Sequence, residues 1–160
     1  VVMKAVQLKE AGKTMDEIVE WIEANKLHFC VQFTVDDLFH LQRGGRVSKM
    51  TAIVGSIINI KPLLVVNNDG ALVSSGTARG RKKSLMTIVD NMEKQMGKYK
   101  EEDNVICVVH GDAPEDAEYL VKLIKERLHK DNIIVNTVSP SIGAHSGPGA
   151  IGVCFMGESR

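Results

Sequence analysis

Apolar residues recur along this chain with two spacings, one typical of helices and one typical of strands. In 15–25, Ile18, Trp21 and Ile22 share one helical face, whereas 28–35 is a short run rich in β-branched and aromatic residues. The helical spacing and its flanking signals predict helices over 1–11, 15–25, 37–42, 50–58, 114–129 and from the basic cluster 79–83 onward. Strand-like runs lie at 28–35, 60–66, 71–77, 104–110, 133–138 and 150–156. We therefore expect an α+β fold, a sheet of about six strands with helices packed against it.

Capping and turn residues support several of these elements. Thr14 and Glu17 have the spacing of a capping box, in which a hydroxyl and a carboxylate each satisfy a free amide at a helix start. Asp36 is expected to cap the short helix that follows it. The Asp69-Gly70 pair stands between two apolar runs and predicts a β-hairpin there.

Length and charge narrow the range of functions. The chain has 160 residues, enough for one sizeable core, and its 20 Lys and Arg balance 20 Asp and Glu. Because a nucleic-acid binder usually carries a basic excess, a dedicated nucleic-acid function is not expected.

Cysteine usage and hydropathy indicate the compartment. Cys30, Cys107 and Cys154 lie in separate apolar runs without the C-x-x-C spacing of metal or redox sites, which favours a reduced, intracellular protein. No apolar run reaches the roughly 18 residues that span a bilayer, and the start lacks the order of a signal peptide. We expect a soluble, cytoplasmic protein with no transmembrane segment. Val1 opens inside a helical pattern without an N-cap, which we interpret as a cut end.

The candidate site centres on the segment 142–149, which carries His145 and Ser146 among glycines and a proline. This composition predicts a bent, non-helical loop between two strands, at the rim of the sheet. An imidazole and a hydroxyl side by side at such a rim suit a small anionic ligand. The alternative is a structural turn in which His145 only makes local hydrogen bonds.

Two arginines are further candidates. Arg46 projects from the turn after Gly44-Gly45, ahead of Ser48, which can cap the next helix; the alternative is a helix end followed by a surface arginine. Arg79 begins a basic cluster at a helix start, where cations oppose the helix dipole unless an anion or nearby carboxylates compensate. The alternative is a solvated basic turn. The remaining histidines are expected to be structural, without metal-site spacing: His28, His40, His110 and His129.

Several motifs in the same order resemble the DegV family of bacterial fatty-acid-binding proteins, some of which present the bound acid to a fatty-acid kinase. They are 33–38, 41–48 with its Gly44-Gly45-Arg46 turn, 60–64 before the Asp69-Gly70 turn, 79–83 and 142–149. Proteins of this family normally have a second, preceding domain. The resemblance therefore identifies residues 1–27 as an inter-domain helical segment and 28–160 as the C-terminal domain.

The same resemblance implies the ligand and the site residues. The acyl chain is expected in an apolar tunnel, with its carboxylate near His145 and Ser146; most members have threonine at the latter position, and serine keeps the hydroxyl. Arg46 and Arg79 match family arginines that lie near the carboxylate or on the face offered to the kinase, and the sequence leaves open which does which. No cofactor, metal or catalytic residue is implied.

Two other functions remain open from the residues alone. His145 with the glycine-rich loop, Arg46 and Arg79 would suit half of a phosphotransferase, although no second acid or base stands beside the histidine in the sequence. The basic cluster 79–83 would also suit a protein-interaction module for an acidic partner.

Overall fold

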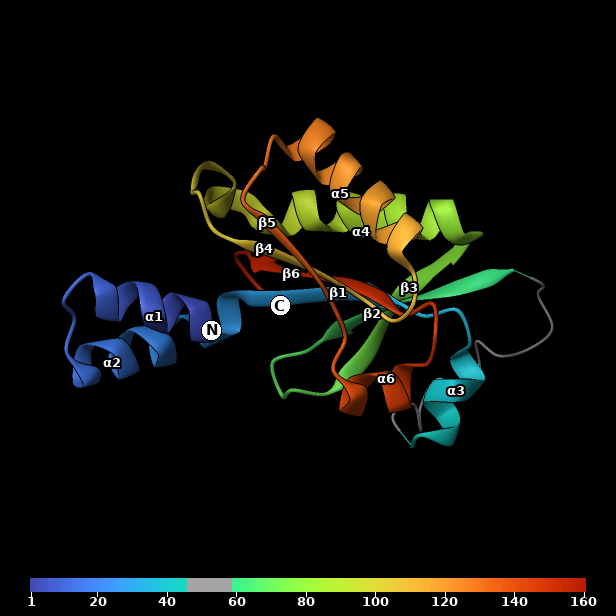
Figure 1. The fold of residues 1–160 in the computed structure, drawn as a ribbon, viewed down its shortest axis with the longest axis horizontal. Helices are drawn as coiled ribbons and strands as arrows, with labels where there is room; N and C mark the ends of the chain where they lie inside the picture. The colour runs from blue at the N-terminus through green and yellow to red at the C-terminus, as the bar shows by residue number, and fades with distance from the viewer. Residues whose placement is uncertain (46–58) are drawn as a thin grey trace.

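The computed structural model describes residues 1–45 and 59–160. Within these residues the centre of the fold is a six-stranded mixed sheet in the order β3-β2-β1-β6-β4-β5 (Figure 1). Its strands are β1 (Phe29–Thr34), β2 (Ile60–Val66), β3 (Leu72–Arg79), β4 (Ile106–His110), β5 (Ile133–Thr137) and β6 (Ile151–Met156). The prediction of an α+β fold with about six strands is confirmed.

The last strand is inserted in the middle of the sheet. β6 pairs antiparallel with both β1 and β4, so that Phe33 lies opposite Gly152 and Cys107 lies opposite Cys154. β2 and β3 form the predicted hairpin, and β4 and β5 are parallel because the chain returns between them through a helix. One face of the central strands is therefore shared by residues from distant parts of the sequence.

Helices lie on both faces of the sheet, and the longer pair covers one of them. The helices are α1 (Val2–Glu10), α2 (Met15–Asn25), α3 (Leu38–Arg43), α4 (Arg81–Met96), α5 (Pro114–Leu128) and α6 (Pro140–Ser146), with 3-10 turns η1 (Lys26–His28) and η2 (Gly97–Glu101). In Figure 1, α4 and α5 pack above the sheet, while the short α3 and α6 lie together below it. The described helices include none long and apolar enough to cross a bilayer.

The main core fills the space between the sheet and the α4–α5 layer. The apolar stripe predicted for α4 is buried as expected: Leu85, Ile88, Val89, Met92 and Met96. Because alternate residues of a strand face opposite sides, Gln32 and Thr34 of β1 also point into this layer, whereas Val31 and Phe33 face the other side. The face opposite α4 and α5 is left for the short helices and for the cavity described below.

The amino-terminal helices form a hairpin beside the end of the sheet (Figure 1). The predicted capping box is present, with the amide of Glu17 donating to the Thr14 hydroxyl and the amide of Thr14 donating to the Glu17 carboxylate. Trp21 of α2 contacts Phe29 at the start of β1, with ring centroids 6.3 Å apart. The division into an inter-domain segment 1–27 and a domain 28–160 stays a prediction.

Some details differ from the sequence-based expectations. The cap of α3 is Asp37 and not Asp36, because the Asp37 carboxylate accepts from the amide of Phe39. The Asp36 side chain instead pairs with Lys61, at 2.8 Å. The predicted helix 50–58, together with Arg46 and Ser48, lies outside the described residues.

Candidate functional site

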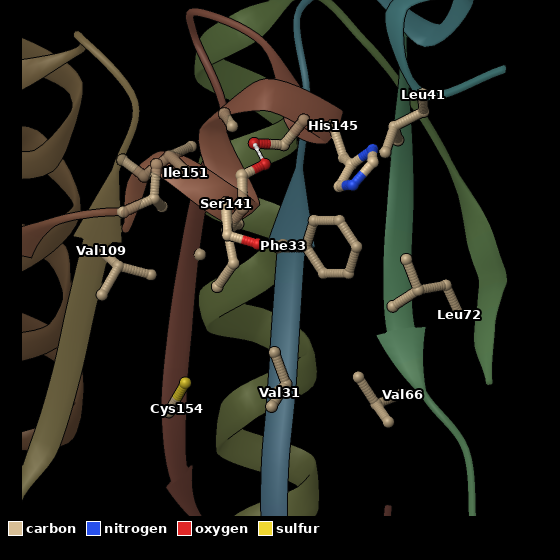
Figure 2. Close-up of a pocket in the computed structure, with 15 residues that line it drawn as sticks. Val31, Phe33, Leu41, Val66, Leu72, Val109, Ser141, His145, Ile151 and Cys154 are labelled. Atoms are coloured by element: carbon tan, nitrogen blue, oxygen red, sulfur yellow. Dashed lines mark hydrogen bonds between the residues drawn. The ribbon is translucent and has the colours of Figure 1, made fainter. Parts of the chain in front are cut away.

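A cavity of about 450 Å³ lies on the sheet face opposite α4 and α5. This volume is within the usual range of small-molecule sites, about 300 to 1,000 Å³. Most of its lining is aliphatic or aromatic, and the polar lining residues are Ser141, His145 and Ser146. Figure 2 shows Ser141 and His145 on one ribbon segment, above a floor that includes Val31, Phe33 and Cys154.

The floor is formed by the central strands. Val31 and Phe33 come from β1, Gly152 and Cys154 from β6, and Val109 from β4. Gly152 is required opposite Phe33, because a Cβ atom there would lie 2.7 Å from the Cβ of Phe33. The absence of a side chain at this position lets the phenylalanine ring and the neighbouring strand share the same floor.

The polar end of the cavity is the helix α6, so the prediction of a non-helical loop at 142–149 is wrong over its first half. Ser139 caps the helix by accepting from the amide of Ile142, and Pro140 stands at its first turn. Gly147, with φ +76°, ends it. Of the residues that predicted the loop, Gly143 lies inside this two-turn helix, Gly147 ends it, and Pro148 and Gly149 follow it.

His145 lies in the last turn of α6 and is half-buried at the cavity. Its ring packs against the end of α3, since a Cβ atom on Gly44 would lie only 3.0 Å from Nδ1 of His145. Ser141 is four residues earlier and therefore shares the same face of the helix. The sequence reasoning missed Ser141 because it did not expect a helix, and the helical spacing is the signal that would have found it.

Ser146 is more buried than the histidine, with 6% of its surface exposed. Its hydroxyl donates to the carbonyl oxygen of Ile142 at 2.9 Å, within the same helix. A hydroxyl has one proton, so Ser146 can donate to a ligand only by giving up this bond. The imidazole of His145 and the exposed hydroxyl of Ser141 are the more accessible polar groups.

Neither predicted arginine is among the described residues that line the cavity. Arg79 is exposed at the end of β3 and does not line the cavity, and Arg46 lies outside the described residues. The arginine that does reach the neighbouring loop is Arg81, which donates through Nε to Asp116 at 2.8 Å and through a guanidinium nitrogen to the Gly149 carbonyl at 2.7 Å. Local carboxylates thus compensate one of the cations at the start of α4.

A second cavity, of about 490 Å³, continues along the same sheet face toward α1. Val31 and Cys154 line both cavities, and they are directly opposite each other on β1 and β6. Lys4 and Arg160 lie at the lining of the second cavity. Together the two cavities mark an apolar path across the sheet that has His145 at one end.

The thiols of this region are poor nucleophiles. Burial raises the pKa of Cys154, and the nearby thiol of Cys107 raises it further. Burial likewise raises the pKa of Cys30 to about 11, against the opposing influence of Arg160. All three cysteines are free, and among the described residues no cluster of three His, Cys, Asp or Glu side chains could hold a metal ion.

The chemistry of the site follows from this inventory. No carboxylate, lysine or arginine is among the described residues that line the first cavity. An apolar path with an imidazole and hydroxyls gathered at one end suits an amphipathic molecule with a long apolar tail and a small hydrogen-bonding or anionic head.

Comparison with known proteins supports the same assignment. Residues 1–158 match a family described as "Uncharacterised protein, DegV family". A DegV domain-containing protein of Clostridium perfringens is 42% identical over 156 residues, which are 98% of this chain and 53% of that protein. The chain spans about half the length of the curated relatives it matches.

Solved structures show the same fold. A structure described as a fatty acid binding DegV family protein from Streptococcus agalactiae is 28% identical, with a TM-score of 0.82 over 97% of this chain and 54% of that one. A structure described as DegV, a fatty acid binding protein from Bacillus subtilis, is also 28% identical, with a TM-score of 0.76 over the same shares of the two chains.

Proposed function

Because the chain belongs to the DegV family, we propose that it is part of a protein that binds a long-chain fatty acid and has no chemistry of its own. The observation that carries the proposal is the apolar cavity, whose polar lining residues all come from α6. The descriptions of the Streptococcus agalactiae and Bacillus subtilis relatives as fatty acid binding proteins support it.

In this proposal the carboxylate of the acid rests at α6. His145 and Ser146 remain the proposed head-group ligands, and Ser141 joins them because it lines the cavity on the same helix. A carboxylate taken out of bulk water needs such donors, and a bond to a charged group is about twice as strong as one between neutral groups. Ser146 contributes only after its hydroxyl leaves the Ile142 carbonyl.

The acyl tail follows the two cavities over Val31 and Cys154. Each buried methylene contributes about 0.8 kcal/mol to the binding free energy, so the tail supplies most of the affinity. The head group fixes the direction in which the acid lies in the groove formed by the two cavities. Because the chain spans about half of its relatives, we propose that residues beyond these 160 also contact the acid.

The partner that we propose is a fatty-acid kinase that takes the presented carboxylate. Arg79 is exposed at the end of β3 and away from the cavity lining, which fits a residue that contacts a partner better than one that holds the ligand. Arg46 remains a proposed ligand or partner contact. The exposure of Arg79 also fits the alternative function, an interaction module for an acidic protein. In that case lipid would not affect binding of the acidic partner.

The phosphotransferase alternative gains no support from the site. Its histidine would need an acid or base beside it to activate a nucleophile. The described residues that line the cavity offer none besides His145 itself.

Native mass spectrometry of the full-length protein tests the proposal. We expect an oleate or palmitate adduct in the wild type and a weaker one in His145→Ala, with a Lys82→Ala variant, on the exposed surface of α4, as the matched control. The absence of any lipid adduct, with no mass shift after addition of palmitate or oleate, would refute the proposed function. Turnover of a phosphorylated metabolite that is lost in His145→Ala would favour the enzyme instead.

A further inference from the structure

The two short helices at the head of the cavity are joined by a reciprocal arrangement of histidines and glycines. His40 of α3 lies over the end of α6, where a Cβ atom on Gly147 would be 3.0 Å from Cγ of the His40 ring. His145 of α6 lies over the end of α3, where a Cβ atom on Gly44 would be 3.0 Å from Nδ1 of the His145 ring. Each helix thus ends in a glycine that makes room for the other helix's imidazole.

His40 also makes a directional bond. Its Nε2 lies 2.9 Å from the carbonyl oxygen of Ala144, the residue just before His145. A carbonyl can only accept, so Nε2 of His40 must carry the proton. This fixes the hydrogen-bonding role of the His40 ring and ties α3 to the last turn of α6.

That turn needs support from outside the helix. α6 has seven residues, far fewer than the roughly 12 to 15 that an isolated helix needs to be marginally stable in water. The last carbonyls of a helix have no partner within it. The Gly143 carbonyl is satisfied by the amide of Gly147, whereas the Ala144 carbonyl receives its donor from His40.

We propose that His40 is the positioning residue for the head-group site, and that it acts by holding the last turn of α6 so that His145 is presented at the cavity. The inference rests on the proposed function in one respect, that His145 meets the carboxylate. His40 itself is absent from the cavity lining, so its effect is transmitted through the Ala144 carbonyl and the Gly147 contact.

Two substitutions and two ligands distinguish a positioning role of His40 from a role in packing alone. His40→Phe keeps a flat ring over Gly147 and removes the donor, whereas His40→Gln keeps a terminal N–H donor for the Ala144 carbonyl. Oleate and methyl oleate have the same tail, but only oleate has a carboxylate for His145. Affinities of the full-length protein for both probes are measured by calorimetry, and imidazole ¹⁵N spectra report the protonated ring nitrogen of His40 and the environment of His145.

The expected result is a loss of oleate affinity of about three- to tenfold in His40→Phe, the range of one hydrogen bond. Methyl oleate affinity stays within about twofold, His40→Gln returns oleate binding to within about twofold of wild type, and wild-type His40 carries its proton on Nε2. Equal losses for both probes, no loss for oleate, or a proton on Nδ1 of His40 would overturn the inference.

A failure of the proposed function gives a different result. If the wild type binds neither probe, fatty-acid binding is wrong, and the spectra alone decide about His40. A change in the His145 ring signals in His40→Phe, reversed in His40→Gln, would then support the positioning role. Unchanged His145 signals in His40→Phe would overturn it.

Discussion

Under the proposed function, we expect substitution of Val31 by phenylalanine to shorten the acyl chain that the two joined cavities accept. Val31 and Cys154 lie directly opposite each other on β1 and β6, and each lines both cavities. The cavities of about 450 and 490 Å³ therefore meet above this pair. A phenyl ring at residue 31 would fill the junction and leave open the end of the first cavity at His145.

The expected change in affinity with chain length follows from the apolar lining of the cavities. At about 0.8 kcal/mol for each buried methylene, two more carbons strengthen binding by about 1.6 kcal/mol, or about 15-fold. Laurate, myristate and palmitate should therefore form a ladder of affinities in the wild type. In Val31→Phe the ladder should level off at a shorter chain, because carbons beyond the junction no longer enter the second cavity.

A displacement assay with a fluorescent fatty acid on the full-length protein measures the ladder. Val135→Phe is the matched control, since Val135 is 48% exposed on the edge strand β5 and lines neither cavity. The reasoning is refuted if Val31→Phe, folded as judged by its melting temperature, keeps the wild-type slope to the longest chain.

Three further changes test contacts elsewhere in the fold. Gly97→Ala should lower the free energy of unfolding by about 1 to 3 kcal/mol in urea titrations, because φ is +47° there and a Cβ atom would lie 2.1 Å from the carboxyl carbon of Glu158; an unchanged midpoint would contradict this. Arg81→Gln should lower the free energy of unfolding by about 1 to 2 kcal/mol, because the bonds to the Asp116 carboxylate and the Gly149 carbonyl are lost. Arg79→Gln, at an exposed residue, should change it by no more than about 0.5 kcal/mol. Equal effects of the two substitutions would contradict a structural role that belongs to Arg81 alone. Bonds from Lys13 and Thr14 lower the pKa of Glu17 from 4.5 to about 2, so its stabilising effect is complete above pH 4.5 and disappears as the pH falls toward 2; the melting temperatures of wild type and Glu17→Gln should converge over that range.

Elements with strong local signals could be predicted from the sequence. α2 has the predicted bounds of 15–25 because a capping box marks its start and the apolar spacing continues to its end. The hairpin of β2 and β3 follows from the Asp69-Gly70 turn, although β3 continues to Arg79. In these segments the local signals along the chain agree with the conformation that the fold adopts.

The order of the strands could not be predicted, because it depends on contacts between distant segments. β6 is the last strand, yet it lies between β1 and β4, with Phe29 opposite Met156. The floor of the cavity is created by this insertion. The sequence identified each strand but gave no sign that Phe33 and Gly152 would meet.

The sequence singled out His145, which lines the cavity, but it did not predict the helix that carries it. His145 lines the cavity, yet it does so from a helix, because Pro140 and Gly147 occupy helix-end positions in which they stabilise a short helix. Arg81 was passed over for its neighbour Arg79, since a run of basic residues does not show which one turns toward the Asp116 carboxylate. Side-chain direction is set by tertiary packing.

The two ends of the groove differ in how firmly the fold holds them. The floor belongs to β1 and β6, central strands whose opposite face is buried under α4 in the main core. The head end belongs to α3 and α6, six and seven residues long, which hold their shape only through contacts such as the bond from His40 to Ala144. Tail binding should therefore tolerate substitutions around the head group, whereas recognition of the carboxylate should respond to any change that loosens α3 from α6. Under the proposed function, an acid that enters tail first would meet the strand floor before its carboxylate reaches α3 and α6.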